Sequence, residues 1–278
     1  MKRLLVIGWL VLTAALLFSC GKDSASTDDE SGTVGEAADS MDMVQNEGAL
    51  LSVATEGATT QTSAVVMPLP ATAEDAAAMA AQRMKDRLQP AGCVTTTVSG
   101  ATLTATLNEC TGRLGLRHVT GTLTITFSIA ADGVHAVASA TGLKVNRATM
   151  DITSQAVRKL IGSEVTTTVT TTGTGTGPRG KAITRDGTYG ITYDVDTECR
   201  TLAGEWKTTV GGNEWSTTVT AFKRCQYDCP GNGGKIVHSN SAKDRTITVT
   251  FDGSATAKWV SSTGTSGTVN LFCGDSEQ

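Results

Sequence analysis

The cysteines are the residues of this chain most able to do chemistry, because thiols form disulfides and bind metal ions. Of the seven, Cys20 stands alone near the start, and six follow from residue 93 onward. These six are Cys93, Cys110, Cys199, Cys225, Cys229 and Cys273. An even number of thiols in an exported chain predicts three disulfides, and the first twenty residues have the pattern of an export signal. Zinc is the alternative, but Cys225 and Cys229 have no second close pair to complete a zinc site.

Two of the expected disulfides close predicted hairpins. The cysteines that end segment 93–110 lie at the open ends of two strands and point away from the apolar face of that hairpin. In segment 199–225, the register that best pairs apolar residues places Cys199 opposite Arg224. A bridge from Cys199 to Cys225 therefore needs a β-bulge or a frayed strand end. We expect the pairs Cys93–Cys110, Cys199–Cys225 and Cys229–Cys273.

Four acidic residues have a spacing that can bind calcium. Asp194, Asp196, Glu198 and Glu205 occupy positions 1, 3, 5 and 12 of a twelve-residue window, like the carboxylates of an EF-hand loop. Cys199, however, stands where that loop needs its turn glycine, and the flanking residues are typical of strands. The alternative is a strand with one acidic, solvated face. We favour the strand and keep the four acids as a candidate calcium site.

No other group of residues points to catalysis or to a cofactor. His118, His135 and His238 lie apart in the sequence, without metal-ligand spacing. The glycine-rich segment 173–180 follows a threonine strand and leads into no helix that would receive a phosphate, so we expect a flexible loop. Ser266 lacks the spacing of a nucleophile elbow. The sequence therefore predicts a protein that is not an enzyme and has no cofactor.

The elements that must position these residues are mostly strands. After Pro90, apolar residues alternate with polar ones, largely threonine, and turn residues recur every eight to twelve positions. This pattern is typical of an all-β domain. The clearest hairpins turn at residues 130–133, 211–212 and 252–254, where glycine occurs between two alternating runs.

One helix is predicted ahead of the strands, at residues 72–89. It begins with a capping box at Thr72 and carries a shallow amphipathic stripe of alanine and methionine, which suits packing against a sheet. Successive hairpins without helical crossovers predict a mainly β fold, a single antiparallel meander over residues 71–278. Such a meander remains a wide sheet, closes into a barrel or folds into a sandwich, and the helix can cover an open face.

The first twenty residues have the pattern of an export signal. Two basic residues precede an apolar run over residues 4–17, which is too short to span a bilayer comfortably, so cleavage is predicted. The run ends in a small residue and a cysteine, Ser19 and Cys20. Here the chain resembles bacterial lipoproteins, whose lipobox has an aliphatic residue three positions before an invariant cysteine and a small residue directly before it. Leu17 and Ser19 match these positions.

The resemblance implies that residues 1–19 are a cleaved signal peptide and that Cys20 becomes the lipidated first residue of the mature chain. Gly21 stands where an aspartate tends to retain such proteins at the inner membrane, which implies the outer membrane. Residues 20–70 then form the lipidated N-terminus and a disordered acidic tether, because they cannot bury enough apolar surface to fold. The tether carries nine acidic residues and one lysine, a net charge of −8.

These features predict a membrane-anchored envelope lipoprotein whose domain, residues 71–278, is a non-catalytic binding or structural module. Its expected partners are the membrane, through Cys20, and an envelope protein, glycan or lipid. One alternative is a carrier of a lipid or other hydrophobic ligand in an incomplete barrel with the helix as its plug. Another is a secreted hydrolase whose catalytic residues the sequence does not reveal. The folded part is nearly neutral and has no basic face, which argues against nucleic acid as a partner.

Overall fold

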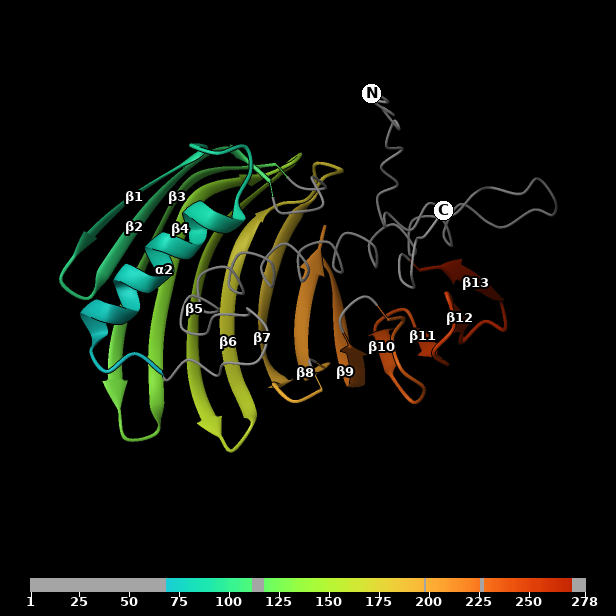
Figure 1. The fold of residues 1–278 in the computed structure, drawn as a ribbon. Coiled ribbons are helices and arrows are strands. Elements are labelled where there is room, and N and C mark those ends of the chain that lie inside the picture. The colour runs from blue at the N-terminus through green and yellow to red at the C-terminus, as the bar shows by residue number, and fades with distance from the viewer. Residues whose placement is uncertain (1–68, 112–117, 198, 226–227, 272–278) are drawn as a thin grey trace, which may run out of the picture.

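The computed structural model describes residues 69–111, 118–197, 199–225 and 228–271. The signal peptide, Cys20, most of the tether, Glu198 and Cys273 lie outside these residues. The described chain forms one helix followed by thirteen strands (Figure 1). These are α2 Ala73–Arg87, β1 Val94–Ser99, β2 Thr102–Cys110, β3 Val119–Ala130, β4 Gly133–Val145, β5 Ala148–Ile161, β6 Glu164–Thr176, β7 Ala182–Asp194, β8 Cys199–Val210, β9 Asn213–Cys225, β10 Lys235–Asn240, β11 Arg245–Phe251, β12 Thr256–Ser261 and β13 Ser266–Asn270.

The thirteen strands form one antiparallel sheet in which each strand pairs with its neighbours in the sequence. The predicted meander is therefore confirmed. Its edges are β1 and β13, and the sheet is not closed. Of the three predicted possibilities, a wide sheet, a barrel or a sandwich, the wide sheet is therefore the correct one. The long strands curve around α2, which lies on the concave side (Figure 1). We call the side that α2 covers the inner face and the opposite side the outer face.

The three hairpins that glycine turns predicted are all present. In the β3–β4 hairpin, Phe127 pairs with Ala136 and Ile125 with Ala138, so each apolar residue faces another, as expected. The β8–β9 hairpin turns at residues 211–212, and the β11–β12 hairpin follows Phe251. The alternation of apolar and polar residues predicted these hairpins correctly because one side of each strand is buried.

The first half of the glycine-rich segment predicted as a flexible loop, residues 173–176, is strand, which corrects that expectation, whereas residues 177–180 lie in the connection to β7. Strand β6 runs on to Thr176 and keeps its register with β7, so that Gly175 pairs with Ile183. A Cβ atom on Gly175 would lie 2.0 Å from the carbonyl oxygen of Thr149 in β5. Glycine is thus needed for close approach of two backbones, a role it often has inside strands.

The helix α2 begins as predicted, with a capped N-terminus. The Thr72 side chain accepts a hydrogen bond from the Asp75 N–H at 3.1 Å, and the helix ends at Arg87, two residues before the predicted end. Its buried face is made of alanines and Met84, but it also includes Arg83. The predicted helix is therefore present, but its expected amphipathic character is not. No helix among the described residues has both the length and the apolar character needed to cross a bilayer.

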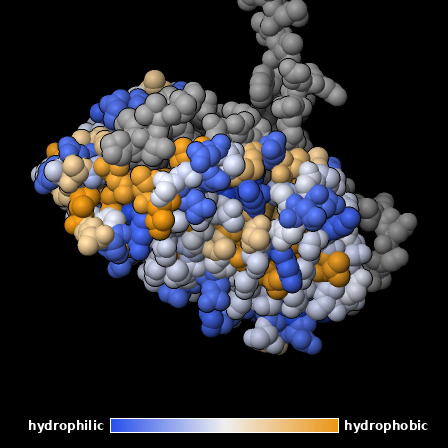
Figure 2. All heavy atoms as spheres, turned by 60° about the horizontal axis from the view of Figure 1, so that its bottom comes forward, coloured by the Kyte–Doolittle hydropathy of each residue, from blue (hydrophilic) through white to orange (hydrophobic). Residues whose placement is uncertain are grey.

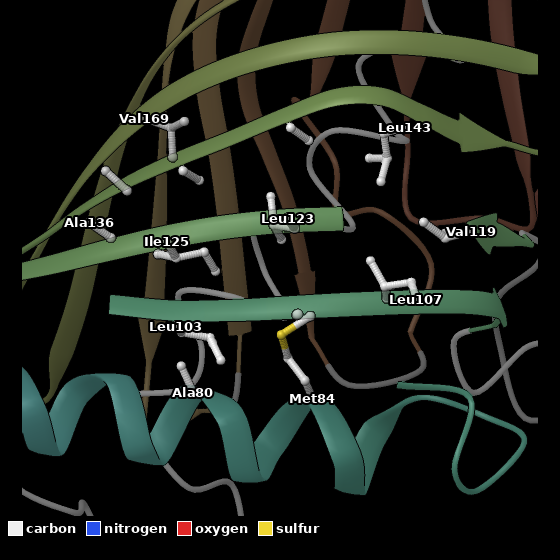
Figure 3. Packing of buried hydrophobic residues seen from close by; sticks show 14 of the residues in the cluster. Ala80, Met84, Leu103, Leu107, Val119, Leu123, Ile125, Ala136, Leu143 and Val169 are labelled. Carbon is white, nitrogen blue, oxygen red and sulfur yellow. The ribbon is translucent and has the colours of Figure 1, made fainter. Parts of the chain in front are cut away.

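The core is densest where α2 packs on β1, β2 and β3. The side chains of Ala80 and Met84 point from the helix toward Leu103 and Leu107 of β2 (Figure 3). Small alanines let the helix approach the sheet closely, and Met84 fills the remaining space. Figure 2 shows the largest group of hydrophobic residues at this end of the molecule, whereas the rest of the visible surface is mostly neutral or hydrophilic.

Two of the three expected disulfides are present, and each lies beside a β-bulge. Cys93 bonds to Cys110, but both are buried with the core rather than facing away from it. The reason is a register shift between Leu107 and Cys110, where Glu109 has a φ of 52° and turns the following cysteine inward. This bulge was not predicted.

The second disulfide joins Cys199 to Cys225, which pair directly across β8 and β9. The bulge required for this pairing is present, because the register shifts between Leu202 and Gly204. Cys229 is also disulfide-bonded, but its expected partner lies outside the described residues. The pairing of Cys229 with Cys273 therefore stays a prediction.

Candidate functional site

The inner face changes character along the sheet. Every buried side chain of β1 to β4 is apolar. From β5 to β10, by contrast, the buried side chains of the inner face include many polar groups. These are Ser154, Arg158, Thr167, Thr171, Arg185, Thr208, Thr217, His238 and Asn240. Because buried polar groups reduce stability unless they are hydrogen-bonded, such a concentration marks this part of the face as a candidate site.

Six of these inner-face residues form one contiguous group, which we call the polar-aromatic cluster. Its members are Arg185 of β7, Trp206 and Thr208 of β8, Trp215 and Thr217 of β9, and His238 of β10. The sheet register brings them together in two rows. One row runs from Arg185 through Thr208 to Trp215, and the other from Trp206 through Thr217 to His238.

The Trp206 indole is the centre of one half of the cluster. The guanidinium carbon of Arg185 lies 5.0 Å from the centre of this ring, in position for a cation–π interaction. Tyr189 meets the same indole edge to face, with ring centres 6.4 Å apart. Space for the indole comes from Gly187, the residue opposite it in β7, where a Cβ atom would lie 2.2 Å from that of Trp206.

His238 is the centre of the other half. Its ring stacks on Trp215 with centres 4.6 Å apart and planes 5° apart, and its Nδ1 atom lies 2.6 Å from the Thr217 hydroxyl. Burial lowers the pKa of His238 to about 4, so the imidazole is neutral at neutral pH. A hydrolytic triad would need a carboxylate on this ring, but Nδ1 contacts Thr217 and Nε2 has no partner in the described part of the chain.

Four buried polar atoms in this region have no hydrogen-bond partner among the described residues. They are Trp206 Nε1, Thr208 Oγ1, His238 Nε2 and Asn240 Nδ2. Each such atom costs on the order of 1–3 kcal/mol of stability when nothing binds it. The indole and amide nitrogens only donate hydrogen bonds. A ligand that satisfies this part of the face must therefore present acceptor oxygens.

A second concave region lies on the outer face, across β4 to β9. It has a volume of about 520 Å³ and is lined mainly by threonines and charged side chains. One row of its lining crosses four strands, from Thr153 through Thr172 and Asp186 to Lys207. Lys207 pairs with Glu214 at 3.5 Å, and both are well exposed. Apart from the buried Arg185, which also borders this hollow, its charged groups are exposed and show no unmet need for a ligand.

The structure does not bring together Asp194 and Glu205, the first and last acids of the candidate calcium site. Asp194 ends β7 and accepts hydrogen bonds from the N–H groups of Asp196 and Thr197 in the following turn. The side chain and backbone of Thr197 hold the pKa of the Asp194 carboxyl below its ordinary value. Glu205 stands six residues beyond the start of β8, which places it about 20 Å along the strand from that turn.

Of the described acids, Asp194 and Glu205 thus belong to strands and Asp196 to a turn, so the strand with one acidic face that was favoured is interrupted at residues 195–197. Glu198 lies outside the described residues. Among the residues that the structure does describe, no three acidic, histidine or cysteine side chains are grouped to hold a metal ion.

The three histidines occupy separate places. His118 lies 3.4 Å from Glu109, and His135 lies 2.6 Å from Asp132 on the β3–β4 turn. Only His238 belongs to the cluster. Trp206, Thr208 and Trp215 lie in the hairpin predicted to turn at residues 211–212, for which no site was predicted. The overlooked signal was polar residues, Thr208 and His238 among them, at inward positions.

Comparisons with known proteins supply no relative: no protein-family model, no curated protein and no solved structure matches this chain.

Proposed function

We propose that this protein is a lipid-anchored lipoprotein of the cell envelope, held in the outer membrane through Cys20, and that its domain is a non-catalytic binding module. The anchor is supported by the lipobox-like end of the first twenty residues. The described strands form one continuous sheet, with their buried polar groups concentrated on part of one face.

The binding face in this proposal is the inner face of β5 to β10, with the polar-aromatic cluster at its centre. The observation that carries it is the set of four buried polar atoms without partners in the described chain. Natural proteins retain such atoms where they serve a purpose, since replacing them with apolar groups costs little or even stabilises. Two of the four are donors only, and Arg185 adds positive charge, so the ligand carries acceptor oxygens such as carboxylates.

The anchor is tested by metabolic labelling with palmitate and by mass spectrometry of the mature protein. We expect labelled protein that begins at Cys20 and is retained in membranes, and a Cys20→Ser variant that is unlabelled and released. Normal processing and membrane retention of that variant would remove the anchor from the proposal.

The binding face is tested with poly-L-glutamate as a probe, followed by the fluorescence of the tryptophans. We expect binding that weakens at least tenfold in Arg185→Gln. The matched control is Lys207→Gln, which removes a cation from the neighbouring row of the outer face and should leave binding unchanged. Equal binding by both variants would contradict the assignment of the inner face.

A second candidate function is that of a hydrophobic-ligand carrier, which is favoured by the open sheet curving around α2 (Figure 1). Solvent extraction of the purified protein, followed by mass spectrometry, distinguishes the two functions. Stoichiometric bound lipid would favour the carrier, and its absence would favour the binding module.

A further inference from the structure

We propose that the edge strand β1 is a docking site for a second copy of this chain, and that two copies join their β1 strands antiparallel into one continuous sheet. The inference goes beyond the proposed function and requires neither the lipid anchor nor the polar-aromatic cluster. Three observations carry it: the open edge of β1, the direction of its backbone groups and the symmetry of its sequence.

The first observation is an open edge without protection. Strand β1 pairs with β2 on one side, and no strand of the described chain pairs with its other side (Figure 1). Edge strands recruit other strands unless charged residues, proline, bulges or a covering element prevent it. The strand reads VTTTVS, with no charged residue and no proline, and its register with β2 is unbroken. The edge is therefore a template for strand addition.

The two edges of the sheet differ in this respect. Strand β13 has five residues and includes Gly267, and glycine weakens a strand. Strand β1, by contrast, is held in place by α2, which packs on it. Of the two edges, β1 is therefore the better prepared to pair with another strand.

The second observation is the direction in which the backbone groups of β1 point. In an antiparallel pair, every second residue exchanges hydrogen bonds with its partner, and the residues between them direct their N–H and carbonyl groups to the opposite side. The Asn108 N–H donates to the Cys93 carbonyl at 2.9 Å, so Cys93 directs its carbonyl toward β2. Counting from Cys93 along β1, the backbone groups of Val94, Thr96 and Val98 face the open edge.

The third observation is that most of β1 is a palindrome. Residues 94–98 read VTTTV in both directions. A two-fold axis at Thr96 places this residue opposite Thr96 of the second copy, and Val94 opposite Val98. These are the residues whose backbone groups face the open edge, so each of the pairs they form can exchange two hydrogen bonds. The same centre thus satisfies the sequence and the backbone.

The side chains also fit this junction. Val94 is buried on the inner face, and by alternation Val98 lies on the same face, where it is 40% exposed. In the dimer Val98 lies beside Val94 of the second copy, which covers part of its exposed surface. On the outer face Thr95 lies opposite Thr97 of the second copy, so no like charges meet.

Helix α2 leaves room for the second copy. It packs on β1, β2 and β3, which places its middle over β2. Across the junction, β2 and its symmetry mate are three strand spacings apart, or about 14 Å. Packed helices lie about 8–10 Å apart, so two α2 helices fit side by side on the shared inner face.

The test is sedimentation of the full mature chain, made free of lipid by Cys20→Ser. We expect a reversible equilibrium of monomer and dimer with a micromolar dissociation constant. In Thr95→Lys with Thr97→Lys, like charges meet across the junction, so the dissociation constant should rise at least tenfold. The matched control is Thr122→Lys with Thr124→Lys on the same face of the interior strand β3, which should associate like the unaltered chain. A monomeric unaltered chain, or equal association by the two variants, would overturn the inference.

Opposite charges test the register of the junction. Thr95→Glu with Thr97→Lys places a carboxylate opposite an ammonium group in both outer-face pairs. This variant has as many charged groups at the edge as the double lysine variant, yet it should associate at least as tightly as the unaltered chain. Association as weak as that of the double lysine variant would contradict a junction centred on Thr96.

A cysteine cross-link locates the two-fold axis. Cα atoms of a hydrogen-bonded antiparallel pair lie about 5.5 Å apart, within the range of about 4.4–6.8 Å that disulfides span. Thr96→Cys should therefore form a covalent dimer in oxidised glutathione at least tenfold faster than Thr97→Cys. In the latter, the two introduced thiols lie on residues offset along the strands, with Cα atoms about 8 Å apart, too far for a direct bridge. Equal rates would show that the copies do not meet about Thr96.

Discussion

The two ends of the inner face share one sheet and one alternating pattern, yet they bury opposite kinds of side chain. At the aliphatic end, formed by α2 and β1 to β4, the strands bury only apolar residues. At the other end, the polar-aromatic cluster buries threonines, an arginine and a histidine between indoles. The alternation specifies the sheet at both ends. Only the identity of the inward residues separates the region that stabilises the fold from the proposed binding face.

The difference has an energetic meaning. Burial of apolar surface contributes about 25 cal/mol per Å², so the aliphatic end stabilises the fold. Buried polar atoms without partners oppose folding, so the cluster reduces the stability of the free protein. Such a trade between stability and function is common at binding sites. Substitutions at the two ends should therefore have effects of opposite sign.

The largest effect is expected at the aliphatic end. Ile125→Ala should lower the free energy of unfolding by about 4 kcal/mol, because it leaves a cavity beneath the helix in a fully buried position. Denaturant unfolding measures the change. The matched control is Val137→Ala on the adjacent strand, where the side chain is 46% exposed and the loss should stay below about 1 kcal/mol. Equal losses would show that the helix does not seal this end.

The disulfides test whether the two ends differ in rigidity as well as in chemistry. Cys93–Cys110 lies at the aliphatic end and closes a loop with a sequence separation of 17 residues. Cys199–Cys225 joins β8 and β9 at the cluster end and closes a loop with a separation of 26 residues. Replacing either pair by alanine should lower the free energy of unfolding by about 3 kcal/mol, because the loop entropies are nearly equal. A much smaller loss for Cys199–Cys225, measured in the same way, would mean that the cluster end remains partly unfolded.

Acid should weaken the cluster end selectively. Unfolded chain binds a proton on His238 near pH 6.5, whereas the folded chain binds it only near pH 4. The stability contributed by the neutral imidazole is thus complete above pH 6.5 and is lost as the pH falls to 4. The loss amounts to about 3 kcal/mol.

Thermal unfolding across this pH range measures the acid effect. His238→Gln should remove the dependence, whereas His135→Gln should retain it. The carboxylates of Asp132, Asp194 and Asp252 have lowered pKa values, so their titration falls below this range and does not obscure the result. An unaltered pH profile in His238→Gln would contradict the burial of a neutral imidazole.

The smallest effect has the opposite sign. Thr208→Val keeps the shape of a fully buried side chain and removes a hydroxyl without a partner among the described residues. We expect the free energy of unfolding to rise by about 1 kcal/mol. Thr209→Val, one residue along on the outer side, should change it by less than about 0.5 kcal/mol. Destabilisation by Thr208→Val would mean that the hydroxyl is satisfied.

Most of the fold was predictable because alternation, turns and caps are local signals. The β3–β4 pairs, the cap at Thr72 and the disulfide that needed a bulge all follow from short stretches of sequence. What failed depended on how closely neighbouring strands approach each other or on single bulged residues. Gly175 marked a close approach to β5, not a loop, and Glu109 turned Cys110 inward.

The candidate site was less predictable than the fold. The spacing of the acids near Asp194 offered only a candidate calcium site, and spacing along a strand separates side chains by about 3.3 Å per residue. The cluster instead draws on four strands, and its rows appear only once their register is known. Thr208 and His238 were visible as polar residues in alternating segments. Their meaning depended on which side of the sheet they face.

Strand order in the meander also bears on how the chain folds. Because each strand pairs with the one made just before it, no pairing has to wait for a distant segment. A polypeptide that is made amino end first can therefore add strands one at a time to a growing edge. The last described strand, β13, has only five residues, and so short an edge is a poor template for recruiting another molecule.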